Sequence, residues 1–140
     1  MHIKDGTRKI IDSKVWGIEY VTQLLDISKE NTNKFDKDLL ENGLVDLQHG
    51  DGWRGLPDAS PFHAIHVGAA AVTFPKNLMK QLAVGGVMII PVGAQESVQV
   101  LYKVKRISSS TSSSFCEEDF KIEKLLNVRY VPLVRRDMKP

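Results

Sequence analysis

The sequence predicts an α/β fold built on a mostly parallel β-sheet that ends in an antiparallel hairpin at the carboxyl end. Two observations predict the parallel part: residues 62–93 read as strand, helix and strand, and both strands are almost continuously apolar. A third observation predicts the hairpin. Residues 98–107 alternate apolar and polar side chains, which is typical of a strand with one face in water.

The central unit begins with an apolar strand over residues 62–67 and a turn of small residues at 68–71. A helix is predicted over 75–82, and the glycine pair at 85–86 predicts a turn before a second buried strand over 87–92. A strand, a helix and a strand within about 30 residues form a βαβ unit. The two strands are therefore predicted to be parallel neighbours.

The preceding part of the chain predicts a second strand and helix, and then a third strand. Residues 15–18 form a short apolar run that ends on Glu19, and the apolar side chains from there to Phe35 fall close to one helical face. Residues 45–49 alternate in polarity, which predicts a strand that ends just before the glycine-flanked Asp51.

The last part of the chain predicts the partner strand of the hairpin. The Ser/Thr tract at 108–114 contains nothing to bury and predicts an exposed loop. Residues 120–134 return as a strand, with a bulge expected at 125–127.

Composition bounds the class of protein. The 140 residues, 42% of them hydrophobic, predict a single domain over residues 1–140. Nineteen basic against 17 acidic residues give no excess that would indicate nucleic acid, and no apolar run reaches the roughly 18 residues of a membrane span. The single cysteine, Cys116, excludes an internal disulfide and predicts a reducing, cytoplasmic setting.

Acidic residues and small residues stand where the predicted strands end, and open α/β sheets bind ligands outside the carboxyl ends of their strands. Glu19 there can accept hydrogen bonds from ribose hydroxyls, and Asp51 can accept from an adenine amine while the neighbouring amide donates to the ring. Because two carboxylates would repel a phosphate, an adenosyl group is favoured over a dinucleotide. The alternatives are a solvated acid at a helix start for Glu19 and a simple turn residue for Asp51.

No metal site is predicted. His63 and His66 are three residues apart in one strand and therefore point to opposite faces of the sheet.

Four segments resemble the protein-L-isoaspartate (D-aspartate) O-methyltransferase family: GDGWRG (50–55), PFHAIHVGAAA (61–71), LAVGGVMIIPVG (82–93) and VRYVPLV (128–134). The similarity is collinear from about residue 15 to the end. It implies a Rossmann-like, S-adenosylmethionine-dependent methyltransferase sheet. It also implies a cofactor site formed by Glu19, Asp51, Gly52, Val67 and Gly68, and a border to the isoaspartyl peptide formed by Ala69, Ala70, Pro91 and Val92.

The resemblance implies methyl transfer from S-adenosylmethionine to the free carboxylate of isoaspartyl residues in damaged proteins. The ester then collapses to a succinimide, which allows repair. Because the carboxylate is ionised at pH 7 and the sulfonium is already activated, no catalytic acid or base is expected. Rate would come from aligning the reacting atoms and excluding water.

The chain departs from this family ahead of Glu19. Members carry a substrate-contacting segment, a first strand and a glycine-rich loop there, whereas Gly6 is the only glycine that precedes Gly17 here. The first strand is therefore expected to be missing from the middle of the sheet, beside the strand that ends at Val67. That would leave two unpaired edges, open to rearrangement or self-association.

Two classes of function follow from this departure. The chain is expected to be a fragment or an incomplete gene model, with impaired methyl transfer on its own. The alternative is a non-catalytic remnant of the methyltransferase fold that acts as a binding or oligomerising module. A different adenosylmethionine or dinucleotide protein of Rossmann type is a weaker option, because the VGAAA and PVG segments argue against it.

Overall fold

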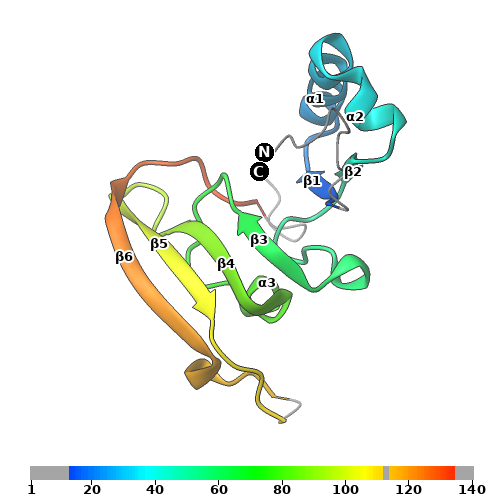
Figure 1. The fold of residues 1–140 in the computed structure, drawn as a ribbon. Helices are drawn as coiled ribbons and strands as arrows, with labels where there is room; N and C mark the ends of the chain where they lie inside the picture. Colours follow the sequence, from blue (N-terminus) through cyan, green and yellow to red (C-terminus); the bar gives the residue numbers. More distant parts are fainter. Residues whose placement is uncertain (1–12, 112–113, 135–140) are drawn as a thin grey trace, which may run out of the picture. The chain divides into compact units, whose positions relative to one another are not determined.

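The computed structural model describes residues 13–111 and 114–134, and their contacts group the chain into two compact units, residues 1–50 and 51–140 (Figure 1). Each unit has its own β-sheet. The α/β class, with parallel strand pairs followed by an antiparallel carboxyl-terminal hairpin, is confirmed. The organisation as one domain stays a prediction.

The first unit is a strand, two helices and a strand. β1 (Val15–Glu19) and β2 (Val45–His49) pair in parallel, and α1 (Thr22–Phe35) and α2 (Lys37–Glu41) connect them. The two predicted strands and the helix between them are confirmed.

A glycine lets the two strands of this unit pack closely. A Cβ atom on Gly17 would lie 2.7 Å from Leu47 Cδ2, so a larger residue in β1 would displace the side chain opposite it. Leu25 of α1 is the buried hydrophobic residue of this unit among the residues described. The remaining apolar side chains of the unit are half-buried or exposed.

The second unit holds a four-stranded sheet in the order β3-β4-β5-β6 (Figure 1). Its strands are β3 (Phe62–His66), β4 (Leu82–Val92), β5 (Gln99–Arg106) and β6 (Phe120–Val128). β3 and β4 are parallel and joined through α3 (Lys76–Lys80), whereas β5 and β6 follow as antiparallel neighbours. The βαβ unit and the final hairpin are therefore both present, with a helix shorter than predicted.

The glycine pair at 85–86 was expected to form a turn, and this is wrong. β4 runs without a break through both glycines, and its pairing with β3 shifts between Phe62 and Ala64. Gly85 takes a φ of 85°, and a Cβ on Gly86 would lie 2.8 Å from the carbonyl oxygen of Phe62. The pair therefore forms a bulge in β4, because only glycine allows this backbone and this close approach.

β6 contains the bulge that the sequence predicts. Leu101 pairs with Leu126 while Tyr102 pairs with Lys124, so Leu125 is the extra residue. The strand ends at Val128 instead of continuing to residue 134. The residues that follow leave the sheet edge and contact the strand ends described below.

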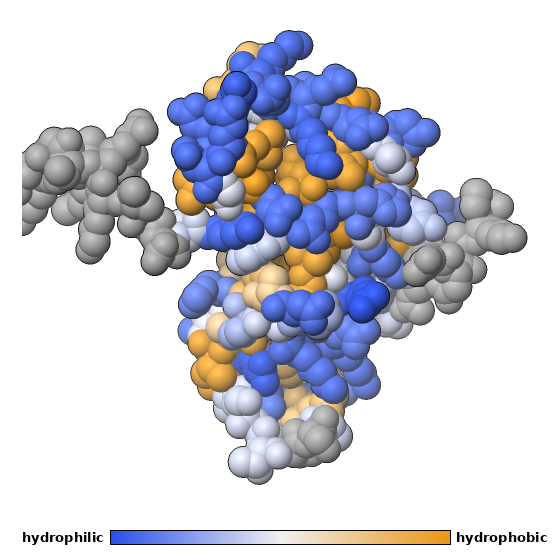
Figure 2. Space-filling view, turned by 90° about the vertical axis from the view of Figure 1, so that its right-hand side faces the viewer, coloured by the Kyte–Doolittle hydropathy of each residue, from blue (hydrophilic) through white to orange (hydrophobic). Residues whose placement is uncertain are grey.

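The hydrophobic core lies in the second unit. Leu82, Met88, Ile90 and Val104 are fully buried along β4 and β5, and α3 adds two buried side chains to the same cluster. Trp53 also belongs to this cluster. In the face shown in Figure 2, apolar side chains (orange) lie at the surface among more numerous polar ones (blue). No helix within residues 13–134, apart from the two residues left undescribed, is long and apolar enough to cross a bilayer.

Candidate functional site

Glu19 lies at the carboxyl end of β1, where the first unit ties its two strand ends together. The amide of Gly50 donates to the carbonyl oxygen of Glu19 at 3.1 Å, and His49 Nε2 lies 2.9 Å from the carbonyl oxygen of Tyr20. The His49 and Tyr20 rings also stack, with centroids 6.1 Å apart. The half-buried Glu19 side chain therefore stands on a fixed strand end.

The Glu19 carboxylate is already bound on one side. Its Oε1 accepts a hydrogen bond of 2.8 Å from the amide of Val21, the residue that caps the start of α1. Within the described part of the chain no hydrogen bond reaches its second oxygen. That oxygen can accept a hydrogen bond from a ligand hydroxyl.

Asp51 opens a tight turn directly after Gly50 in the chain. Its Oδ1 accepts from the amide of Trp53 at 2.9 Å, and its carbonyl oxygen accepts from the amides of Arg54 and Gly55 at 3.1 and 3.3 Å. This is the Asx-turn geometry expected of an aspartate in a turn. The second carboxylate oxygen has no hydrogen bond among the described residues. Asp51 can therefore shape the turn and also bind a ligand.

Two anchors that the sequence did not predict hold this turn in the second unit. Trp53 Nε1 donates to the carbonyl oxygen of Leu133 at 2.9 Å, across 80 residues of sequence. A Cβ on Gly52 would lie 3.1 Å from Leu133 Cδ1, so the turn packs directly against the segment that follows β6. The buried side chain of Gln81 donates to the carbonyl oxygen of Arg54 at 2.8 Å and accepts from the amide of Leu56 at 2.8 Å.

The small-residue turn after β3 lies between the end of β4 and the segment after β6. Ala70 exchanges main-chain hydrogen bonds of 2.7 and 2.9 Å with Val131 and Leu133, and Ala71 exchanges two of 2.9 Å with Pro91 and Gly93. Val67 donates to a carbonyl oxygen of β4 at 3.0 Å. The structure thus brings the predicted peptide-binding residues of both strand ends together.

These residues differ in how much surface they present. Ala70 is 3% exposed and Pro91 is fully buried, so their side chains pack inside the unit. Gly68 is exposed, and Ala69 and Val92 are half-buried. A ligand at this edge of the sheet would meet the latter three, supported by the two buried residues.

Gln99 is a further residue that the sequence did not single out. It is 1% exposed, its Nε2 donates to the carbonyl oxygen of Ala94 at 3.2 Å, and its Oε1 accepts from the amide of Tyr130 at 2.9 Å. It therefore fixes the loop after β4 to the segment after β6. The signal was present as a polar residue between Val98 and Val100, but strand alternation alone would place it in water.

Each unit offers groups that suit recognition more than acid–base chemistry. In the first unit the Glu19 carboxylate keeps one oxygen for a ligand. In the second unit the Asp51 carboxylate does the same, and a turn of small residues lies where β3, β4 and the segment after β6 meet. Carboxylate oxygens accept from hydroxyls and amines, and a turn without large side chains lets a ligand approach the main chain closely.

A protein-family comparison identifies the chain's relationships. The family model described as protein-L-isoaspartate(D-aspartate) O-methyltransferase matches residues 7–138. Among similar proteins, protein-L-isoaspartate O-methyltransferase of Caenorhabditis elegans is 38% identical over 123 residues, which cover 88% of this chain and 51% of that protein. The enzyme of the same name from Vibrio cholerae is 46% identical over 94 residues, covering 67% of this chain and 40% of that protein.

The fold has relatives among solved structures. One is a putative protein-L-isoaspartate O-methyltransferase from Plasmodium falciparum in complex with S-adenosyl-L-homocysteine, with a TM-score of 0.72, 28% identity, and coverage of 87% of this chain and 53% of that one. The chain spans about half the length of the curated relatives it matches. Because the family model matches nearly its whole length, the chain belongs to the protein-L-isoaspartate(D-aspartate) O-methyltransferase family.

Proposed function

We propose that this chain takes part in methyl transfer from S-adenosylmethionine to isoaspartyl carboxylates of damaged proteins. One observation carries the proposal. Glu19 is the last residue of β1 and Asp51 follows β2 by two residues, and each carboxylate uses one oxygen for a main-chain amide and keeps the other for a ligand. The names of the relatives support the isoaspartyl substrate, and the S-adenosylhomocysteine bound by the Plasmodium falciparum protein supports the cofactor.

Each residue of the proposed site has a role that its chemistry suits. Glu19 accepts hydrogen bonds from the two ribose hydroxyls. Asp51 accepts from the exocyclic amine of adenine, and the Gly52 amide donates to the ring. Gly68 is exposed and has no side chain, so it leaves room for the rest of the adenosyl group after β3, and the buried Val67 supports that strand end from inside.

The peptide is proposed to lie along the edge formed by Ala69 and Val92. Ala70 and Pro91 support that edge from inside, because both are buried. Bound S-adenosylmethionine would be the donor of an electrophilic methyl group to a substrate carboxylate oxygen, and its sulfur would keep the electron pair of the broken carbon–sulfur bond. No proton moves, so the chain's task is to align the reactants and exclude water.

The setting of the protein is also a proposal. We place it in the cytoplasm, with proteins and not nucleic acids as partners. The single free cysteine, Cys116, and the near balance of basic and acidic residues support this view.

The direct test is calorimetric titration of the full chain with S-adenosylhomocysteine. Glu19→Gln and Asp51→Asn are the sharpest variants, because each amide keeps an acceptor for Val21 or Trp53 and replaces the ligand-facing acceptor with a donor. We expect each to weaken binding about tenfold or more, since a hydrogen bond to a charged group contributes about 1.5–3 kcal/mol. Asp58→Asn, on the exposed turn at residues 57–59, is the matched control and leaves binding unchanged.

A second assay separates the two classes of function. Esterification of an isoaspartyl peptide by the same preparation supports the enzyme. A chain that is folded by circular dichroism and binds no S-adenosylhomocysteine contradicts the proposal and favours the non-catalytic binding module.

A further inference from the structure

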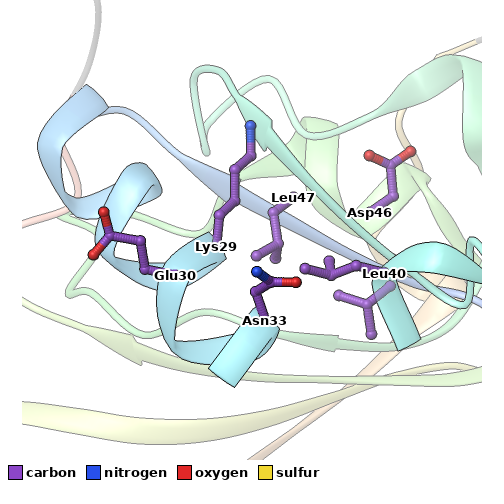
Figure 3. A pocket seen from close by; sticks show the side chains of 7 residues that line it. Lys29, Glu30, Asn33, Leu40, Asp46 and Leu47 are labelled. Atoms are coloured by element: carbon purple, nitrogen blue, oxygen red, sulfur yellow. The ribbon is translucent and has the colours of Figure 1, made fainter. Parts of the chain in front are cut away.

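An open groove of about 510 Å³ lies within the first unit, and it shares no residue with the proposed methyl-transfer site. Figure 3 shows Leu40 of α2 and Leu47 of β2 at its floor beside Asn33 of α1, with Lys29 and Glu30 of α1 at its rim. Val45 and Asp46 of β2 complete the lining. The groove therefore runs along one strand and has an apolar floor and a charged rim.

The strand beside the groove has one edge that pairs with nothing among the described residues. The amide of Val15 donates to the carbonyl oxygen of Leu44, and the amide of Gly50 donates to Glu19, so the even-numbered residues of β2 bond to β1. Main-chain groups alternate in direction along a strand. The amides and carbonyls of Val45 and Leu47 therefore face away from β1, on the side where no strand of residues 13–111 or 114–134 pairs with β2.

This edge has only part of the usual protection against pairing. Edge strands are commonly protected by short length, charged side chains, proline or a bulge. β2 (VDLQH) is short and carries one charge, Asp46, but it has no lysine, proline or bulge, and its register with β1 is unshifted over all five residues. An extended polypeptide can add to such an edge through main-chain hydrogen bonds.

We propose that the occupant is β2 of a second copy of this chain, paired antiparallel across a two-fold axis at Leu47. That register places Leu47 opposite its own counterpart, Val45 opposite His49, and Asp46 opposite Gln48. No like charges meet, and the Gln48 amide can donate to the Asp46 carboxylate of the other copy, as it already does within one chain at 3.0 Å.

The paired strands are short, so the association is weak. Five residues on each side and a shallow groove bury much less than the roughly 1,200–2,000 Å² of a stable interface. We therefore expect a monomer–dimer equilibrium with a dissociation constant of about 10–500 µM. The pairing joins β1 and β2 of two copies into one four-stranded sheet.

Analytical ultracentrifugation of the full chain, from about 5 µM to 1 mM, tests the proposal with two variants of opposite sign. Gln48→Asp sets two aspartate pairs against each other across the two-fold axis and raises the dissociation constant about tenfold. Gln48→Lys makes two ion pairs with Asp46 and lowers it by a similar or smaller factor. Gln48 projects from the strand face opposite to Leu47, so both variants leave the groove floor intact.

Asn127 supplies the matched control. It is an exposed amide on β6, the edge strand of the other sheet, and Asn127→Asp and Asn127→Lys make the same charge changes. These variants leave the dissociation constant within about twofold of the original value. The proposal is overturned if the parent chain stays monomeric throughout the range, if both Gln48 variants shift association in the same direction, or if the Asn127 variants shift it as strongly.

Discussion

The two units of this chain bury their apolar side chains very unequally. All nine residues of the core cluster belong to residues 51–140, whereas Leu25 is the buried hydrophobic residue of the first unit among those described. On α1, Leu24 and Ile27 are 49% and 51% exposed, and Phe35 at its end is 80% exposed. A four-stranded sheet with a packed face supports more stability than two short strands that are joined by two helices and bury little apolar surface. We therefore expect the two units to differ in stability and to unfold separately.

The largest effect expected is in the core of the second unit. Ile90→Ala removes a fully buried side chain from β4 and costs about 2–5 kcal/mol of unfolding free energy. Leu25→Ala is the counterpart in the first unit and costs about 2 kcal/mol, because its exposed surroundings can relax into the space.

The two tryptophans report on the units separately, because Trp16 lies in the first and Trp53 in the second. With Trp16→Phe as background, the urea transition followed by Trp53 fluorescence shifts for Ile90→Ala and stays in place for Leu25→Ala. A common shift for both variants would show one cooperative unit and remove the contrast.

A second, smaller effect compares two glycines that share one backbone conformation. Gly43 in the first unit has a φ of 66° with nothing within 4 Å of an added Cβ, and Gly55 in the second has a φ of 65°. At Gly55 the Cβ would lie 2.5 Å from Gln81 Oε1 and 2.6 Å from Leu78 Cδ2. Gly43→Ala is expected to cost about 1–2 kcal/mol for the left-handed backbone alone.

Gly55→Ala adds about 1–3 kcal/mol for overpacking, since it must displace the Gln81 side chain from Arg54 and Leu56. Urea midpoints of the two variants measure the difference, each followed by the tryptophan of its own unit. Equal costs at both positions would mean that Gln81 and Leu78 move aside for the added Cβ at Gly55 without a loss of stability.

The same contrast decides what the sequence can predict. Local patterns are sufficient for the strand β1, the βαβ unit and even the bulge at Leu125, because each depends on neighbouring residues. The glycines at 85–86 misled the prediction because a turn and a bulge use the same residue type. The bulge forms because β4 pairs with β3 on both sides of the glycines, and this pairing is a long-range contact that the sequence pattern does not contain.

The candidate site shows the same limit. Strand ends and residue types single out Glu19 and Asp51 as candidates, and their role in ligand binding stays a prediction. The contacts that fix their surroundings join residues far apart in sequence, as Trp53 does with Leu133 and Gln99 with Tyr130. No periodicity in a single sequence contains such pairs, so they required the folded chain.

The smallest effect expected is confined to acid pH and to the second unit. Asp119 is 6% exposed at the base of the loop between β5 and β6, and its carboxylate accepts from the amide and hydroxyl of Ser110 and from the hydroxyl of Ser108. These hydrogen bonds, chiefly that from the Ser110 amide, hold the pKa of Asp119 below its ordinary value. Since the folded pKa is the lower one, the stabilisation is complete above the unfolded pKa of about 3.9 and is lost as pH falls through the folded value.

Asp119→Asn removes this dependence, because the amide does not titrate. The difference in urea midpoint between the parent chain and Asp119→Asn, followed by Trp53, should be largest above about pH 4 and shrink steadily below it. The transition followed by Trp16 in the first unit should show no such difference. A gap between the two proteins that stays constant down to pH 2 would mean that the Asp119 charge contributes nothing and that the loop is held by its shape alone.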